Sequence, residues 1–110
     1  MITNQEVEKA AAYIRDNAGE YAKAKAERIY LHEFRKSKKA LLINECEDGT
    51  IQTKESYAYA HPEYQQLLDD LRTAIENEEK LNWMMKAATI KIEIWRTEQA
   101  NNRNIDRSHQ

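Results

Sequence analysis

The chain has 110 residues, of which 41% are hydrophobic and 33% charged, with two glycines, one proline and one cysteine. This length supports one domain, the scarcity of Gly and Pro excludes a sandwich or barrel, and the hydrophobic content excludes full disorder. Cys46 alone allows no internal disulfide and suits a reducing compartment, and no apolar run is long enough to span a membrane. We expect an all-α, cytoplasmic protein without a membrane segment.

The net charge of -2 conceals blocks of opposite sign. Residues 21–45 contain seven basic and three acidic residues, whereas residues 46–79 contain two basic and nine acidic ones. Blocks of this size produce local fields, so the two are expected to face each other. If they pair within one chain, little positive surface remains for nucleic acid. If they pair between chains, they help to orient the partners.

A first helix is predicted over about residues 4–17. It begins with a capping box, in which the side chains of Thr3 and Glu6 each satisfy a free backbone N–H. Apolar residues then follow the spacing of an amphipathic helix: Val7, Ala10, Ala11 and Ile14. Gly19 is the predicted stop, because glycine accepts the left-handed conformation that closes a helix. The alternative is a kink there, which would leave two nearly continuous helices.

A long helix is predicted over about residues 20–45, which are rich in strong helix formers. A turn and linker follow over residues 46–61, with Gly49 at the turn. Residues 51–60 fit either a short helix or an ordered loop. Pro62 then begins a new helix, because proline suits the first turn and disfavours helix at the residue before it. His61 is expected to cap that helix.

A second long helix is predicted over about residues 62–105, followed by a frayed tail that includes His109. Its apolar or tolerated residues follow steps of three and four without a slip, which is a heptad register. They are Tyr64, Leu67, Leu71, Ala74, Glu78, Leu81, Met85, Ala88, Ile92, Trp95, Gln99 and Asn102. About forty helical residues span roughly 60 Å, more than a globule of this size, so this helix must protrude, pair or break.

A second apolar row, Trp83, Ala87, Ile90 and Ile94, runs beside the first. One intramolecular partner cannot cover both rows, and the simplest cover is another copy of the chain. The expected fold is therefore all-α, a long helical hairpin or coiled-coil-like pair of helices that self-associates. The predicted oligomer interface comprises Leu81, Trp83, Met85, Ala88, Ile92 and Trp95.

No constellation of residues favours catalysis. His32 lacks the second histidine of a helical zinc pair, because Lys36 occupies that place, and the acidic neighbours of Cys46 disfavour a reactive thiolate. Glu76 and Glu79 fall where heptads carry solvated charge. We predict no enzyme, no metal and no cofactor, with a small metal-dependent enzyme as the least favoured alternative.

A basic cluster is the best candidate for binding nucleic acid. It comprises Arg35, Lys36, Lys38 and Lys39, and Tyr30 and Phe34 nearby offer faces on which unpaired bases could stack. Arg96, Arg103 and Arg107 form a second basic row, where oligomerisation could multiply a weak site. The alternative is that the clustered cations meet the acidic block and that the aromatic rings belong to the core.

Several stretches resemble a known class of proteins when taken in order. They are residues 28–41, 55–64, 79–83, 92–96 and 101–103, with a Lys-rich helix, a Tyr-bearing linker, and a long helix with a Leu and a Trp near its middle. This pattern resembles small helical proteins that tailed phages encode among their replication and recombination genes. More distantly, it is similar to phage recombination mediators of the UvsY type.

This resemblance implies a non-enzymatic, oligomeric accessory that binds single-stranded DNA and helps to load a recombinase in the host cytoplasm. Its Lys-rich row would be Arg35, Lys36, Lys38 and Lys39. A recombinase or a single-strand-binding protein would then be a partner. The alternative is a protein-interaction module, such as an inhibitor of a host nuclease, which uses the acidic face from Glu63 to Glu79 and binds no DNA.

Overall fold

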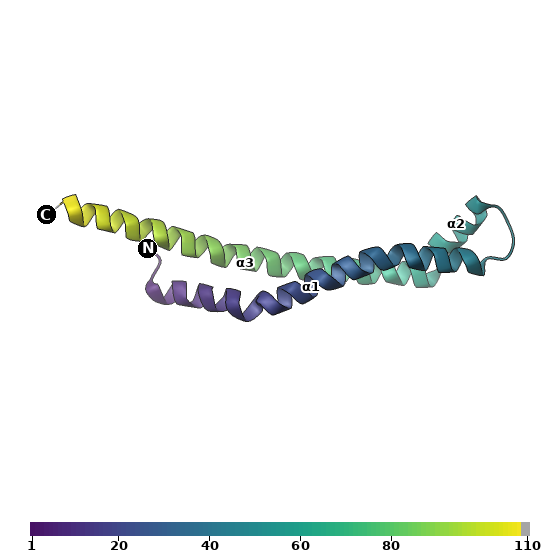
Figure 1. Ribbon diagram of the computed structural model, residues 1–110, viewed down its shortest axis with the longest axis horizontal. Coiled ribbons are helices and arrows are strands. Elements are labelled where there is room, and N and C mark those ends of the chain that lie inside the picture. The colour runs from purple at the N-terminus through teal and green to yellow at the C-terminus, as the bar shows by residue number, and fades with distance from the viewer. Residues whose placement is uncertain (109–110) are drawn as a thin grey trace. The chain divides into compact units, whose positions relative to one another are not determined.

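The computed structural model describes residues 1–108 and contains three α-helices, with no strand among those residues (Figure 1). Helix α1 spans Asn4–Glu45, α2 spans Ile51–Ala60 and α3 spans Pro62–Ser108. The predicted fold class, an all-α protein built as a long helical hairpin, is confirmed.

Helix α1 continues through Gly19, so the predicted stop at residues 17–19 is wrong. Gly19 does not have the positive φ that a helix-ending glycine adopts. A glycine inside a helix costs only about 1 kcal/mol relative to alanine, and strong helix formers flank it here. Half-buried and buried residues also keep one heptad register along α1, at Val7, Ala10, Ile14, Asn17, Tyr21, Ala24, Arg28, Leu31, Arg35, Lys38 and Leu42. A break would disrupt this packed stripe.

Both ends of the connection between α1 and α3 form as expected. Gly49 takes a φ of 116°, the left-handed region that a turn uses. The side chain of Thr50 accepts a hydrogen bond from the backbone N–H of Thr53 at 3.2 Å and caps α2, so residues 51–60 form the short helix and not the loop. His61 Nδ1 accepts from the backbone N–H of Glu63 at 3.1 Å. His61 therefore caps α3, as predicted.

The predicted capping box at the start of α1 is also present. The backbone N–H of Glu6 donates to the Thr3 hydroxyl at 3.1 Å, and the backbone N–H of Thr3 donates to the Glu6 carboxylate at 3.3 Å. At the other end of the chain, α3 extends to Ser108, beyond the predicted limit of 105. His109, placed in the predicted tail, lies outside the described residues.

The heptad register of α3 is confirmed by the burial of its side chains. Every predicted position from Tyr64 to Asn102 is buried or half-buried. We call this set of α3 positions, together with the matching stripe of α1, the seam. The heptad spacing could be recognised in the sequence because a helix that packs along one partner buries one residue in every three or four.

The helices form two compact units. The terminal unit comprises residues 1–21 and residues from 80 onward, and the turn unit comprises Ala22–Glu79. In the turn unit Leu42 and Ala58 are fully buried and pack with Tyr64. Among the described residues of the terminal unit, Ala10 is the single buried apolar side chain. Along residues 1–108, no helix is long and apolar enough to cross a membrane.

Candidate interaction surfaces

The basic and acidic blocks pair inside the turn unit, as one of the two predicted arrangements requires. The Arg28 guanidinium donates two hydrogen bonds to the Glu78 carboxylate, at 2.5 and 2.9 Å. Glu78 is buried and Arg28 is half-buried, both on the seam. The bonds from Arg28 hold the pKa of Glu78 below its usual value, against the opposing effect of burial.

Two of the four clustered cations are also engaged by the acidic block. Lys38 Nζ lies 2.6 Å from Glu63, and its bond lowers the pKa of that carboxyl group. Lys39 Nζ lies 3.8 Å from Glu55 and 4.7 Å from the centre of the Tyr59 ring. Hydrogen bonding with Tyr59 raises the pKa of Lys39 above its usual value. These contacts use positive charge that would otherwise be available to phosphates.

Three members of the basic cluster line a small hollow in the turn unit. Arg35, Lys36 and Lys39 lie there with Tyr59 and Tyr64, around a volume of about 250 Å³. Lys36 contacts Glu33 at 3.5 Å, whereas the described residues give Arg35 no ion pair. The structure thus brings three of the four predicted cations together and turns Lys38 toward Glu63.

The second predicted basic row lies on the terminal unit. Arg96 and Arg103 are exposed and line a shallow hollow on α3 with Glu93, Thr97 and Ala100. No ion pair joins either arginine to another of the described residues. These two cations remain available to an anionic partner, but two charges alone give only a weak site.

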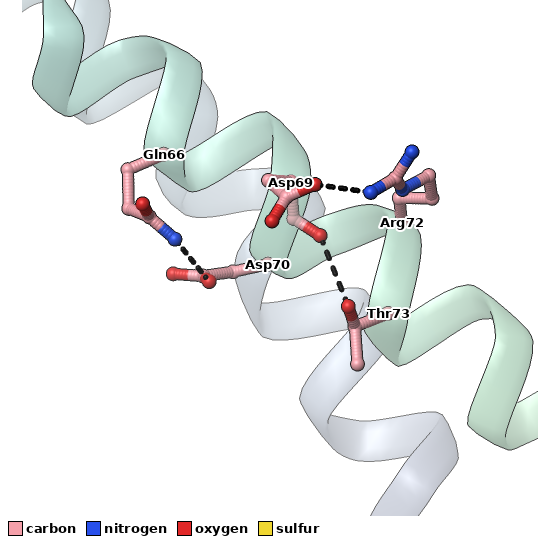
Figure 2. A network of polar contacts seen from close by, with 5 residues as sticks. All are labelled: Gln66, Asp69, Asp70, Arg72 and Thr73. Carbon is pink, nitrogen blue, oxygen red and sulfur yellow. Dashed lines mark hydrogen bonds and ion pairs between the residues drawn. The ribbon is translucent and has the colours of Figure 1, made fainter.

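The acidic face of the turn unit is partly neutralised by its own helix. Figure 2 shows this stretch of α3, where Arg72 Nη2 contacts Asp69 at 2.5 Å and the Gln66 amide donates to Asp70 at 3.0 Å. The Thr73 hydroxyl donates to the backbone carbonyl of Asp69 at 3.2 Å. With Glu63 and Glu78 also paired, the face that the protein-interaction alternative invoked carries less free charge than the sequence count suggests.

The structure divides the predicted oligomer interface. Leu81, Met85, Ala88, Ile92 and Trp95 are half-buried on the seam of the terminal unit. Trp95 illustrates the contact, because its indole N–H donates to the Asn4 side chain at 3.0 Å. In this fold these five residues pack against α1 of the same chain. Trp83, the sixth, lies on a different face.

That different face is the second apolar row, which we call the outer row: Trp83, Ala87, Ile90 and Ile94. All four residues are exposed, with 62% of Trp83, 53% of Ile90 and 46% of Ile94 accessible to solvent. Lys86 Nζ lies 4.6 Å from the centre of the Trp83 ring. Scattered apolar residues on a surface are ordinary, but a contiguous row of large ones marks an interaction site.

A groove borders the outer row within the terminal unit. Its volume is about 260 Å³. Small side chains from both helices line it, Ala10, Ala87 and Ala88, together with Tyr13 and Met84. Glu6, Lys9 and Lys91 line it as well. Sequence reasoning missed this groove, because it depends on which residues of α1 lie beside Met84, and no periodicity within one helix reports that.

Of the two aromatic residues predicted as stacking faces beside the basic cluster, Tyr30 is exposed and Phe34 is half-buried. Tyr30 stacks on Phe34 of the same helix, with 5.8 Å between ring centres. Ile29 and Leu41 are also exposed, whereas Leu31 and Leu42 lie on the seam.

Among residues 1–108, no group of three or more His, Cys, Asp or Glu side chains is arranged to hold a metal ion.

The comparisons with known proteins give no relative. The chain matches no protein-family model, no curated protein and no solved structure. The resemblance to phage recombination mediators therefore stays a prediction.

Proposed function

We propose that this protein is a non-catalytic interaction protein that binds another protein chain through the outer row and its groove. The observation that carries this proposal is the exposure of Trp83, Ile90 and Ile94 in a contiguous row. Burying such a row releases about 25 cal/mol for each Å² of apolar surface. The internal pairing of the basic and acidic blocks favours this function over one based on charge. A cytoplasmic location belongs to the same proposal, since Cys46 is unpaired.

A photo-crosslinking residue placed at Ile90 tests this function in cells that express the protein. Activation should yield a covalent adduct with a second polypeptide. The same residue at Thr89, which is adjacent to Ile90 but exposed on another side of α3, is the matched control and should yield little. Equal labelling at both positions, or none at either, would contradict the proposal.

Single-stranded DNA binding, as a phage recombination or replication accessory, is the second candidate. The observation in its favour is the hollow where Arg35, Lys36 and Lys39 meet Tyr59 and Tyr64. Cations there could contact phosphates while an exposed ring stacks on a base. Exposed Arg96 and Arg103 would add contacts, and a recombinase or single-strand-binding protein would be the further partner.

A labelled oligothymidine titration across salt concentrations tests this second candidate. Binding should weaken steeply between about 50 and 200 mM salt, as counterion release requires. Charge reversal of Arg35 and Lys36 should abolish it, whereas reversal of Lys23, an exposed cation elsewhere on α1, should have little effect. Reversing Lys38 and Lys39 instead would also break contacts with Glu63 and Glu55 on other helices, whereas the contact between Lys36 and Glu33 lies within α1. Salt-insensitive binding, or none at low salt, removes this candidate.

A further inference from the structure

The terminal unit has too little core to account for its own stability. Ala10 is its single buried apolar side chain among the described residues, and Cys46 offers no internal disulfide. Units of this size are usually stabilised by a disulfide, a metal or association with another chain. The outer row provides a contiguous exposed apolar patch that can serve as an association surface. The chain itself is the one partner that is always present when it folds.

We propose that the occupant of the outer row is a second copy of this chain, packed antiparallel about a two-fold axis, with Lys86 of each copy facing Glu93 of the other. This inference rests on the proposed function and names its partner. It differs from the interface predicted from sequence, since that set is mostly seam. The charges that flank the outer row decide the orientation.

Lys86 and Glu93 lie on one flank of the outer row, a heptad apart, and Lys91 and Glu98 lie on the other. In a parallel, in-register pair, opposite flanks meet, so Lys86 would face Lys91 of the second copy and Glu93 would face Glu98. Both contacts are repulsive. In an antiparallel pair, each flank meets the same flank of the second copy. Trp83 then lies opposite Ile94, Ala87 lies opposite Ile90, and Lys86 comes within reach of Glu93 twice.

The patch also has the self-complementary shape that a two-fold contact requires. It carries large exposed side chains, Trp83 and Ile90, beside a groove that small alanine side chains line. In a two-fold contact each copy supplies both the protruding group and the recess. Met84 would meet Lys91 of the second copy, where the aliphatic stem of the lysine can cover the thioether. A foreign partner would need none of this internal matching of charge and shape.

Sedimentation of the purified full chain over a range of concentrations tests the proposal. The wild type should form a dimer. Lys86→Glu and Glu93→Lys should each weaken dimerisation roughly tenfold, because each replaces two attractive contacts by two repulsive ones. An equimolar mixture of the two variants should recover dimerisation, and so should the double variant, because both restore opposite charges at every contact. Glu8→Lys, at an exposed position of α1, is the control and should leave the dimer unchanged.

Circular dichroism of each variant establishes that it remains helical, so that a lost dimer is not an unfolded chain. A dimer that is indifferent to both reversals, or that the mixture and the double variant fail to restore, would overturn the antiparallel arrangement. A wild type that stays monomeric at every concentration would overturn it as well. In that last case an adduct between position 90 and a different protein would still support the proposed function, so the two failures are distinguishable.

Discussion

The contact between Arg28 and Glu78 is the main polar feature of the seam at the scale of single residues. Two hydrogen bonds join a half-buried guanidinium to a buried carboxylate. A charged pair in a mostly apolar seam costs desolvation, and its best-established benefit is to select one register of the helices. A shift of α1 along α3 by one heptad would separate the two charges and leave Glu78 buried without its partner.

Replacing Glu78 by glutamine should destabilise the protein by about 1–2 kcal/mol, because a half-buried guanidinium loses its charged acceptor. Thermal and urea unfolding measure this change. Glu76→Gln is the matched control, since Glu76 is exposed two residues away, and it should change stability by less than about 0.5 kcal/mol. Equal effects of the two substitutions would contradict the role given to the pair.

Acid should remove the stability that the contact between Arg28 and Glu78 contributes. Because the pKa of Glu78 is lowered in the folded state, its stabilising effect is fully present above the ordinary value of 4.5 and is lost as pH falls through the folded pKa. The difference in melting temperature between wild type and Glu78→Gln should therefore be constant above that pH and shrink below it. If the difference in melting temperature instead grew on acidification, the predicted direction of the pH dependence would be wrong.

Helix α1 shows how a long element tolerates one poor residue. Gly19 lies within a 42-residue helix, and a Cβ atom added there would meet nothing within 4 Å. Gly49 is the opposite case, because its φ is 116° and an added Cβ would lie 3.0 Å from Thr53 Cγ2. The two glycines therefore differ in role: Gly19 leaves α1 continuous, whereas Gly49 makes the turn between α1 and α2.

Gly19→Ala should stabilise the protein by about 0.5–1 kcal/mol, since alanine lowers the entropy lost on forming the helix and clashes with nothing. Gly49→Ala should destabilise it by about 1–2 kcal/mol, because an L-residue is strained at that φ. Urea unfolding of the two variants beside the wild type measures both. A loss of stability in Gly19→Ala would indicate that the helix needs flexibility at that point.

For the whole molecule, the main feature is that few of its hydrophobic residues are buried. Hydrophobic residues make up 41% of the sequence, yet only six are buried among the described residues. A single chain therefore leaves much of its apolar surface in contact with water. Association is the general means by which such a chain gains burial, and it couples stability to concentration.

The melting temperature of the wild type should consequently rise with protein concentration. Ile90→Glu should abolish that dependence, because a carboxylate in the centre of the outer row cannot be buried without a partner. Thr89→Glu is the adjacent control, since Thr89 is exposed on another side of α3, and the dependence should persist there. Scanning calorimetry over a hundredfold range of concentration provides the measurement. A concentration-independent wild type would contradict the prediction.

The sequence by itself determined the all-α class, the heptad register of α3, the capping of α1 by Thr3 and the turn at Gly49. These features are local: they depend on the spacing of apolar residues and on backbone preferences within a few positions. The same local reasoning failed at Gly19, where the seam, a contact between distant segments, keeps the helix continuous.

Only the tertiary structure decided which charges and which apolar rows remain available. Lys38 and Arg35 are near neighbours in the sequence, yet Lys38 binds Glu63 and Arg35 lines a hollow. Likewise, Trp83 and Met85 are two residues apart, but Met85 faces α1 and Trp83 faces solvent. Periodicity shows that a helix has two apolar faces, but which face meets the other helix depends on side chains that the hairpin brings from far along the chain.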